Sequence, residues 1–425
     1  MKWLPASIAP ASVLLLVPIW FGLAEAEEVR ASRSETRTVD GSVHRTYAGS
    51  VRATFGGSRV ESDSASVSPK TREYVFQQNV RFEDERYVVF ADELLYDSTV
   101  PSATLKGNVR LSDGSRSLQA GRVTYREDRS TVAAAGDVRV SLKDSSGFLR
   151  ADVWFQNVRT DSMSGSGHVR YTTSGPDTLT IVSGRVASVD NGILAFAEAV
   201  RLGQSVWTTL SATAIVSAGR DTVVLSGDVT MTRAGEGDSL VATSESALLS
   251  VEDEMLVGAI LTGDVVVNTR ANKGDSAVTV VRADTCAITL NGNDLQSLDA
   301  SGSATLVVEN SENAHSALDA GQLSIDMDAN RPRRVIASGE AKMVHTSGDG
   351  ETTARISGHG LSLGLDASVL ESVRVDSVAT CDIEGEHPTR LSGDRLELSF
   401  KDGKLSTSEV EGRVKGRYTP EEDAK

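Results

Sequence analysis

The feature that most constrains this chain is an internal repeat. The string Gly107-Asn108-Val109-Arg110-Leu111 returns, with small changes, at residues 136–140, 167–171, 227–231 and 263–267. With looser copies there are twelve repeat starts, at positions 49, 78, 107, 136, 167, 198, 227, 263, 302, 339, 379 and 412. They lie 29 to 31 residues apart up to position 227 and 33 to 40 apart after it. A period of this length predicts a stack of repeated structural units.

Each repeat contains two strings with the residue pattern of β-strands. In residues 105–111 the apolar side chains share one parity, so they share one face of a strand. A second string follows each start, as in residues 118–125, where the apolar parity slips by one between Ala120 and Val123. A slip at a small residue predicts a β-bulge or a sharp bend, which keeps both apolar pairs on one side.

These patterns predict an all-β fold, a repetitive antiparallel β-trough. It would have about 24 strands in about twelve two-strand repeats. We expect a folded solenoid with a V-shaped cross-section, in which each strand crosses both walls of the V. No sustained 3.6-residue apolar period follows residue 26, so almost no helix is expected. Most of the extra length of the later repeats follows the first strand, as in 268–275, which predicts longer turns at one edge. We therefore divide the chain after residue 26 into three segments. Residues 27–262 hold repeats of about 30 residues, residues 263–418 hold repeats with longer turns, and residues 419–425 form a charged tail. The change near Gly263 marks either two domains or one stack.

Residues 1–26 have the pattern of an export signal. Lys2 precedes an apolar run, and Ala24-Glu25-Ala26 supplies small residues for cleavage. An uncleaved membrane anchor is the alternative. Either reading predicts that the rest of the chain is exported, and we expect it to lie in the periplasm.

Charge and cysteine content exclude some classes of protein. Acidic residues outnumber basic ones by 59 to 43, for a net charge of −16, which argues against nucleic acid as a partner. Only Cys286 and Cys381 are present in 425 residues, so the chain is not a disulfide scaffold. The register places both on inward positions about five strands apart, so we expect them to be unpaired.

No residues point to catalysis, to a metal or to a cofactor. The esterase-like string Gly360-Leu361-Ser362-Leu363-Gly364 lies inside a repeat strand, where a nucleophile elbow would need a turn and then a helix. The six histidines are scattered. Asp recurs after the repeat glycine and after the small residue of the second string. We expect these Asp residues to have a structural role at a bend. The alternative is a row of stacked Asp side chains that binds calcium. We predict that the chain is not an enzyme.

The inward apolar stripe is the candidate functional surface. Its predicted members are Val80, Phe82, Leu94, Tyr96, Leu105, Val109, Leu111, Val123, Tyr125, Val138, Val140, Val229, Met231, Val265 and Val267. From the residues alone, a dry core and a lipid-lined groove both fit.

The repeated strings resemble those of the OstA-like, or LptA-type, family of periplasmic lipopolysaccharide-transport proteins (LptA, LptC and the N-terminal domain of LptD). The resemblance rests on the Gly107–Leu111 type of string, on Val89-Phe90-Ala91-Asp92 and Leu149-Arg150-Ala151-Asp152, and on the export signal. It is clearest over residues 71–160. It implies a β-trough whose apolar interior shields acyl chains, a location between two membranes, and no catalytic residues.

With this resemblance, we interpret the chain as a periplasmic carrier or bridge that binds lipopolysaccharide or a related lipid A-like amphiphile, for transport to the outer membrane. Its expected protein partners are other OstA-like transport proteins, which would pair with the terminal edge strands. The alternative is a structural or adhesive β-solenoid with a dry core and no lipid ligand. An enzyme of polysaccharide metabolism is a third reading.

Overall fold

The computed structural model describes residues 28–418 with short gaps, and the predicted signal peptide and charged tail lie outside this part of the chain. The gaps are 40–41, 56–57, 69, 84–87, 98, 101, 113–116, 127–128, 142–146, 158, 161, 175–177, 190–192, 235–237, 254, 272–276, 311–312, 329–330, 367, 386–387 and 402–403. Within the described residues no helix is long and apolar enough to cross a membrane.

The described residues form 27 β-strands and no helix. The first thirteen are β1 (Glu28–Arg30), β2 (Arg33–Val39), β3 (Ser42–Phe55), β4 (Ser58–Ser68), β5 (Glu73–Glu83), β6 (Val88–Asp97), β7 (Ser102–Ser112), β8 (Ser117–Arg126), β9 (Thr131–Ser141), β10 (Gly147–Asn157), β11 (Ser162–Thr173), β12 (Thr180–Val189) and β13 (Ile193–Gln204). The others are β14 (Trp207–Val216), β15 (Thr222–Ala234), β16 (Asp238–Glu252), β17 (Met255–Ala271), β18 (Ala277–Asn291), β19 (Asp294–Glu309), β20 (His315–Asp328), β21 (Arg331–Thr346), β22 (Thr353–Asp366), β23 (Val369–Glu384), β24 (Thr389–Gly393), β25 (Arg395–Lys401), β26 (Lys404–Glu411) and β27 (Lys415–Tyr418).

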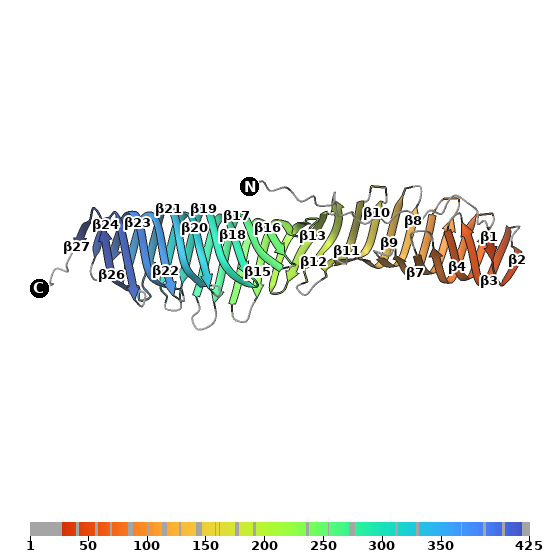
Figure 1. Ribbon diagram of the computed structural model, residues 1–425, viewed down its shortest axis with the longest axis horizontal. Helices are drawn as coiled ribbons and strands as arrows, with labels where there is room; N and C mark the ends of the chain where they lie inside the picture. Colours follow the sequence, from red (N-terminus) through yellow and green to blue (C-terminus); the bar gives the residue numbers. More distant parts are fainter. Residues whose placement is uncertain are drawn as a thin grey trace, which may run out of the picture. The chain divides into compact units, whose positions relative to one another are not determined.

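The chain divides into two compact units. Unit 1 comprises residues 1–200 and 215–219, and unit 2 comprises 201–214 and 220–425. The change of repeat spacing at Gly263 lies inside β17, well within unit 2. In each unit consecutive strands pair in antiparallel ladders, as in β7 with β8 and β17 with β18 (Figure 1).

The predicted all-β repeat fold is confirmed, with three differences in strand count. Within the described residues the twelfth repeat has one strand, broken near Gly412 into β26 and β27, which pair with β25 and β24. β1 and β2 precede the first repeat and both pair with β3, so β3 is not an edge strand. Val51, which the repeat pattern places on the first strand, is fully buried. The second strand of the eleventh repeat is broken at Asp394 into β24 and β25, which pair with the two halves of β23.

The later repeats have longer strands. β7 has 11 residues and β8 has 10, whereas β17 has 17 and β19 has 16. Residues 268–271, which the sequence pattern assigned to a turn, belong to β17 and pair with β18. The added length therefore extends the wall of the trough as well as its connections.

A bend lies near the middle of the strands, where the repeat strings predicted it. Gly107 and Asn108 both adopt positive φ, +71° and +46°, and the register of β7 with β8 shifts between Lys106 and Val109. In β8 the burial parity slips after Ala120, as predicted. Nine of the twelve repeat starts have two consecutive residues of positive φ. Glycine adopts this conformation freely, and Asn, Asp and His tolerate it, which explains the Gly-Asn and Gly-Asp pairs.

The bend folds the sheet of each unit into a trough with two walls. From β3 to β23 the odd-numbered strands run from one edge, called edge 2, to the opposite edge, called edge 1, and the even-numbered strands run back. In unit 2, Arg233 near the edge 1 end of β15 forms an ion pair with Asp294 at the edge 2 start of β19. A flat strand of 16 residues would hold its two ends about 50 Å apart. The two edges meet because the sheet is folded.

Candidate lipid-binding trough

All fifteen residues predicted to point inward are buried. None exposes more than 5% of its surface, and Val138, Val140, Met231 and Val267 expose none. They line both walls: Val109 and Leu111 lie between the bend and edge 1, whereas Leu105 lies between the bend and edge 2. The largest fully buried side chains include Trp154, Trp207 and Tyr96. Since these side chains leave almost no surface to water, an acyl chain can enter only where the walls separate.

The outside of the bend explains why the two repeat strings occur together. Asp92 of the second string lies against Gly107 of the next strand, and a Cβ at Gly107 would stand 2.1 Å from its Oδ2. The amide Nδ2 of Asn108 donates a hydrogen bond to the same oxygen at 3.0 Å. His168 and Asp152 make the corresponding contact at 2.7 Å. The absence of a Cβ at the repeat glycine leaves space for the Asp carboxylate, and the side chain of the residue after the glycine forms a hydrogen bond with it.

The recurring Asp residues therefore have a structural role at the bend. Asp137, Asp228 and Asp264 adopt positive φ of 43° to 47°, which is the conformation that follows the repeat glycine. Within the described residues no group of three or more His, Cys, Asp or Glu side chains could hold a metal ion. Ser362 of the esterase-like string lies in β22 between the buried Leu361 and Leu363, as predicted.

In unit 1 the described contacts across the edges are aromatic. Phe55, at the edge 1 end of β3, meets Tyr74 at the edge 2 start of β5 with ring centroids 5.4 Å apart. It also meets Tyr96 at the edge 2 end of β6, at 5.6 Å. Tyr171 of β11 and Phe196 of β13 repeat the arrangement at 6.0 Å. All five rings are buried, and such pairs stabilise a fold beyond the area they bury.

In unit 2 the described contacts across the edges are largely ionic. The Nη2 atom of Arg233 donates to Oδ1 of Asp294 at 2.6 Å, and the Arg233 side chain is only 11% exposed. Further along, His345 near edge 1 packs against Phe400 near edge 2, with centroids 5.1 Å apart. Nδ1 of His345 also shares a hydrogen bond with the Ser316 hydroxyl at 2.9 Å.

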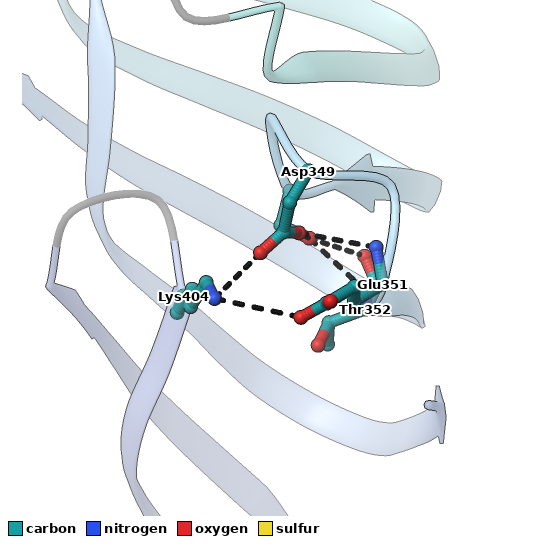
Figure 2. A network of polar contacts seen from close by, with 5 residues as sticks. Asp349, Glu351, Thr352 and Lys404 are labelled. Atoms are coloured by element: carbon teal, nitrogen blue, oxygen red, sulfur yellow. Dashed lines mark hydrogen bonds and ion pairs between the residues drawn. The ribbon is translucent and has the colours of Figure 1, made fainter. Parts of the chain in front are cut away.

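A second ionic contact joins the turn between β21 and β22 to the start of β26 (Figure 2). Nζ of Lys404 lies 2.5 Å from Oδ2 of Asp349 and 3.7 Å from Oε2 of Glu351. The Ser347 hydroxyl and the backbone N–H of Glu351 donate to the other oxygen of Asp349, at 2.6 and 3.1 Å. The hydrogen bond from Lys404, then the one from Ser347, holds the pKa of Asp349 well below its usual range. The same contact raises the pKa of Lys404.

The longer strands of unit 2 add an inward row that the predicted stripe missed. Two residues beyond Met231, Val267 and Met343, toward edge 1, the inward positions hold Arg233, Thr269 and His345. Thr269, Thr279, Ser316 and His345 are all at least 91% buried. In unit 1 this side of the wall ends in apolar residues such as Phe82, Leu111 and Val140. Extending the same parity by two residues in the sequence would have found the polar row.

The two cysteines are free and buried, on β18 and β23. Burial, with a smaller contribution from Asp299, raises the pKa of the Cys286 thiol to about 12. Burial and Asp382 raise the pKa of Cys381 to about 12. Both therefore serve as apolar core residues, as their inward positions in the repeat predicted.

Comparisons with known proteins add little to this geometry. No family model matches the sequence, and no curated protein matches it. Among solved structures the chain is similar to LptH of Pseudomonas aeruginosa, described as the LptA homologous periplasmic component of a lipopolysaccharide transport device. The identity is 14%, the match covers 26% of this chain and 81% of LptH, and the TM-score is 0.24. At these values the likeness carries no argument about function.

Proposed function

We propose that this protein is a periplasmic carrier or bridge that binds lipopolysaccharide or a related amphiphile in its apolar trough. The observation that carries the proposal is the way the trough closes. Its interior rows are apolar, and its two edges meet through side chains, as in Phe55 with Tyr74 and Lys404 with Asp349. Such edges can part without breaking the backbone hydrogen bonds within each wall. The resemblance of the repeat strings to OstA-like proteins supports the same reading.

The expected affinity comes from burial of acyl chains. Each CH₂ group moved from water to an apolar interior contributes about 0.8 kcal/mol, so one 12-carbon chain supplies about 10 kcal/mol before the cost of opening. The opening exposes side chains that were buried, and ligand chains must replace those contacts. Several chains on one lipid therefore bind better than one.

The test is saturable binding of lipopolysaccharide or a lipid A analogue by the purified protein. Val109→Glu places a charge on the interior, and Val109→Thr places a hydroxyl there at nearly constant volume, so both should weaken binding. The matched control is Arg110→Glu, because Arg110 neighbours Val109 but points outward and is exposed. Circular dichroism checks that each variant is folded. Wild-type protein that shows no saturable binding would exclude the carrier.

The near-complete burial of the stripe also favours a second candidate, a structural solenoid with a dry core. The two candidates differ in whether the edges separate. In the carrier, joining Asp349→Cys to Lys404→Cys with a short bis-maleimide should slow lipid uptake, whereas blocking the same thiols with a monofunctional maleimide should not. In the structural solenoid, neither treatment changes a binding signal, because there is none.

Protein partners belong to this proposal as well. The strands at the two ends are β1 and β2, which precede the first repeat, and β26 and β27. Val414, between β26 and β27, is 52% exposed. We propose that another OstA-like protein pairs with a terminal strand and continues the trough. Crosslinks in cells from Arg37 of β2 and from Val414 to a β-rich protein would support this, and crosslinks only from outward wall positions would oppose it.

A further inference from the structure

Four polar atoms on two neighbouring strands of unit 2 are buried and have no hydrogen-bond partner. They are Nε1 of Trp207, Oγ1 of Thr209, and Nε and Nη1 of Arg233. Trp207 and Thr209 expose 2% of their surface each, and the Arg233 side chain exposes 11%. A buried donor without a partner costs about 1–3 kcal/mol, so a group of them at one place calls for an explanation.

The register of β14 and β15 places these side chains together. The backbone N–H of Ala234 donates to the carbonyl of Val206 at 3.2 Å, and the Thr232 hydroxyl donates to the carbonyl of Thr208 at 3.2 Å. This register sets Trp207 opposite Arg233. Trp207 and Thr209 are the two buried positions at the start of β14. Arg233 continues the inward row of Val229 and Met231.

The chemistry of the group selects the ligand. Arg and Trp side chains offer only N–H donors, and the guanidinium keeps its positive charge at any physiological pH. Asp294 occupies one guanidinium nitrogen and is itself 76% exposed, so it leaves Nε and Nη1 without an acceptor. A ligand with several acceptor oxygens and a negative charge, such as a phosphate ester, satisfies all of these donors.

The surroundings of Arg233 show what the anion is attached to. Arg233 lies near edge 1, and the next inward residues toward the bend are the buried, apolar Met231 and Val229. A molecule with its anionic group on Arg233 therefore has apolar wall along the rest of its length. This arrangement matches an anionic amphiphile with its head at the edge and its chain in the trough.

We propose that Arg233, Trp207 and Thr209 form a binding site for the phosphate group of an amphiphile whose chain lies in unit 2. The proposal rests on the function proposed above and adds to it a position for the head group. It makes the interior of unit 2 selective for anionic amphiphiles, whereas the apolar interior alone would take any chain.

The test is calorimetric titration of the full chain with three probes below their micelle concentrations: dodecyl phosphate, dodecyltrimethylammonium and inorganic phosphate. Arg233→Gln should weaken binding of dodecyl phosphate at least about ten-fold and leave dodecyltrimethylammonium unchanged, as expected for loss of a charged hydrogen bond. Thr209→Val, which keeps side-chain volume, and Trp207→Phe, which keeps an aromatic ring but removes the indole N–H, should each weaken it about three-fold. Arg270→Gln, an exposed residue near the same edge, is the matched control and should change nothing.

The outcomes separate this inference from the proposed function. Equal binding of both dodecyl probes, unaffected by Arg233→Gln, overturns the phosphate site while the lipid trough stands. Inorganic phosphate that binds as tightly as dodecyl phosphate, and loses binding in Arg233→Gln, identifies a site for a free anion and overturns the amphiphile. If neither dodecyl probe nor lipopolysaccharide binds, the proposed function itself fails.

Discussion

In unit 1 the strands at a cross-edge contact have about 11 residues, as in β5, whereas in unit 2 they have up to 16, as in β19. The offset, meaning the number of strand positions between two strands that meet across the edges, is also larger in unit 2. Phe55 of β3 meets rings on β5 and β6, two or three strands on, but Arg233 of β15 meets β19, four strands on. Because β24 and β25 are the two halves of one strand, His345 of β21 meets Phe400 of β25 three strands on.

These offsets follow from one slant of the strands. At about 4.8 Å per strand and 3.3 Å per residue, the offset of two or three strands in unit 1 is about 12 Å over about 36 Å of strand, and the offset of three or four strands in unit 2 is about 17 Å over about 53 Å. The ratio of sideways displacement to strand length is nearly the same in the two units. Longer strands at a constant slant must therefore meet partners further along the stack. Strand length therefore sets which residues face each other across the edges.

The chemistry of closure differs along with the geometry. Unit 1 closes with rings such as Phe55 and Tyr96, which water and salt do not weaken. Unit 2 closes with Arg233–Asp294 and with Lys404–Asp349, which salt and extremes of pH weaken. We therefore expect unit 2 to open more readily than unit 1.

The largest expected effect is on thiol labelling, which reports on unit 2 alone because unit 1 contains no cysteine. Burial raises the pKa of both Cys286 and Cys381 to about 12, so neither forms a thiolate in the folded state at pH 8. With an opening free energy of about 5 kcal/mol, labelling should be slower than in unfolded protein by about 5,000-fold. An added exposed thiol, Ser408→Cys, should react at once. Rapid labelling of the native cysteines would show that unit 2 is not closed.

The next largest effect is on the aromatic closure of unit 1. Phe55→Ala removes a fully buried ring that contacts Tyr74 and Tyr96. We expect it to lower the free energy of unfolding by about 3–5 kcal/mol, measured by urea denaturation. Phe90→Ala is the control, because Phe90 is 48% exposed, and it should change stability by less than about 0.5 kcal/mol. Similar losses from both variants would contradict the assignment of the closing contact.

A smaller effect distinguishes the bends of the two units. Gly107 in unit 1 has φ +71° and would place a Cβ 2.1 Å from Asp92, whereas Gly339 in unit 2 has φ +85° and open space around it. Gly339→Ala should therefore cost about 1–2 kcal/mol for the left-handed backbone alone. Gly107→Ala should cost more, and Asp92→Ala in the same chain should recover part of the difference. Equal costs for the two glycines would mean that the carboxylate gives way freely.

The smallest effect is that of Lys404→Met on unit 2. The pKa of Asp349 is lowered in the folded state, so its network stabilises the fold above the unfolded aspartate value of about 3.9 and loses that contribution as the pH falls through the lower folded value. The difference between wild type and Lys404→Met, measured by urea denaturation at pH 7, should shrink below pH 4 and in 1 M salt. Lys401→Met, an exposed neighbour on β25, is the control. A difference independent of pH would point to packing by the lysine stem instead.

The sequence predicted the repeat, the bend and the inward stripe because each depends on residues close together in the chain. Parity placed Leu105 and Val109 correctly, and the slip after Ala120 marked the bulge. Parity did not predict the pairing of Arg233 with Asp294, 61 residues apart, because it depends on the slant of the strands. Nor did it predict that β1 and β2 pair with β3, since neither has the repeat strings.

The offset of three or four strands in unit 2 also limits how its repeats can be gained or lost. Because a strand closes against one three or four places away, a lone two-strand repeat has no partner for its own edge, and the smallest closed module has four or five strands. Removing one repeat between β15 and β19 would bring the first residue of β21, Arg331, opposite Arg233 in place of Asp294. Duplication or deletion of a repeat thus changes the cross-edge contacts of strands up to two repeats before it in the chain. Such a stack tolerates added repeats at its ends more easily than in its interior.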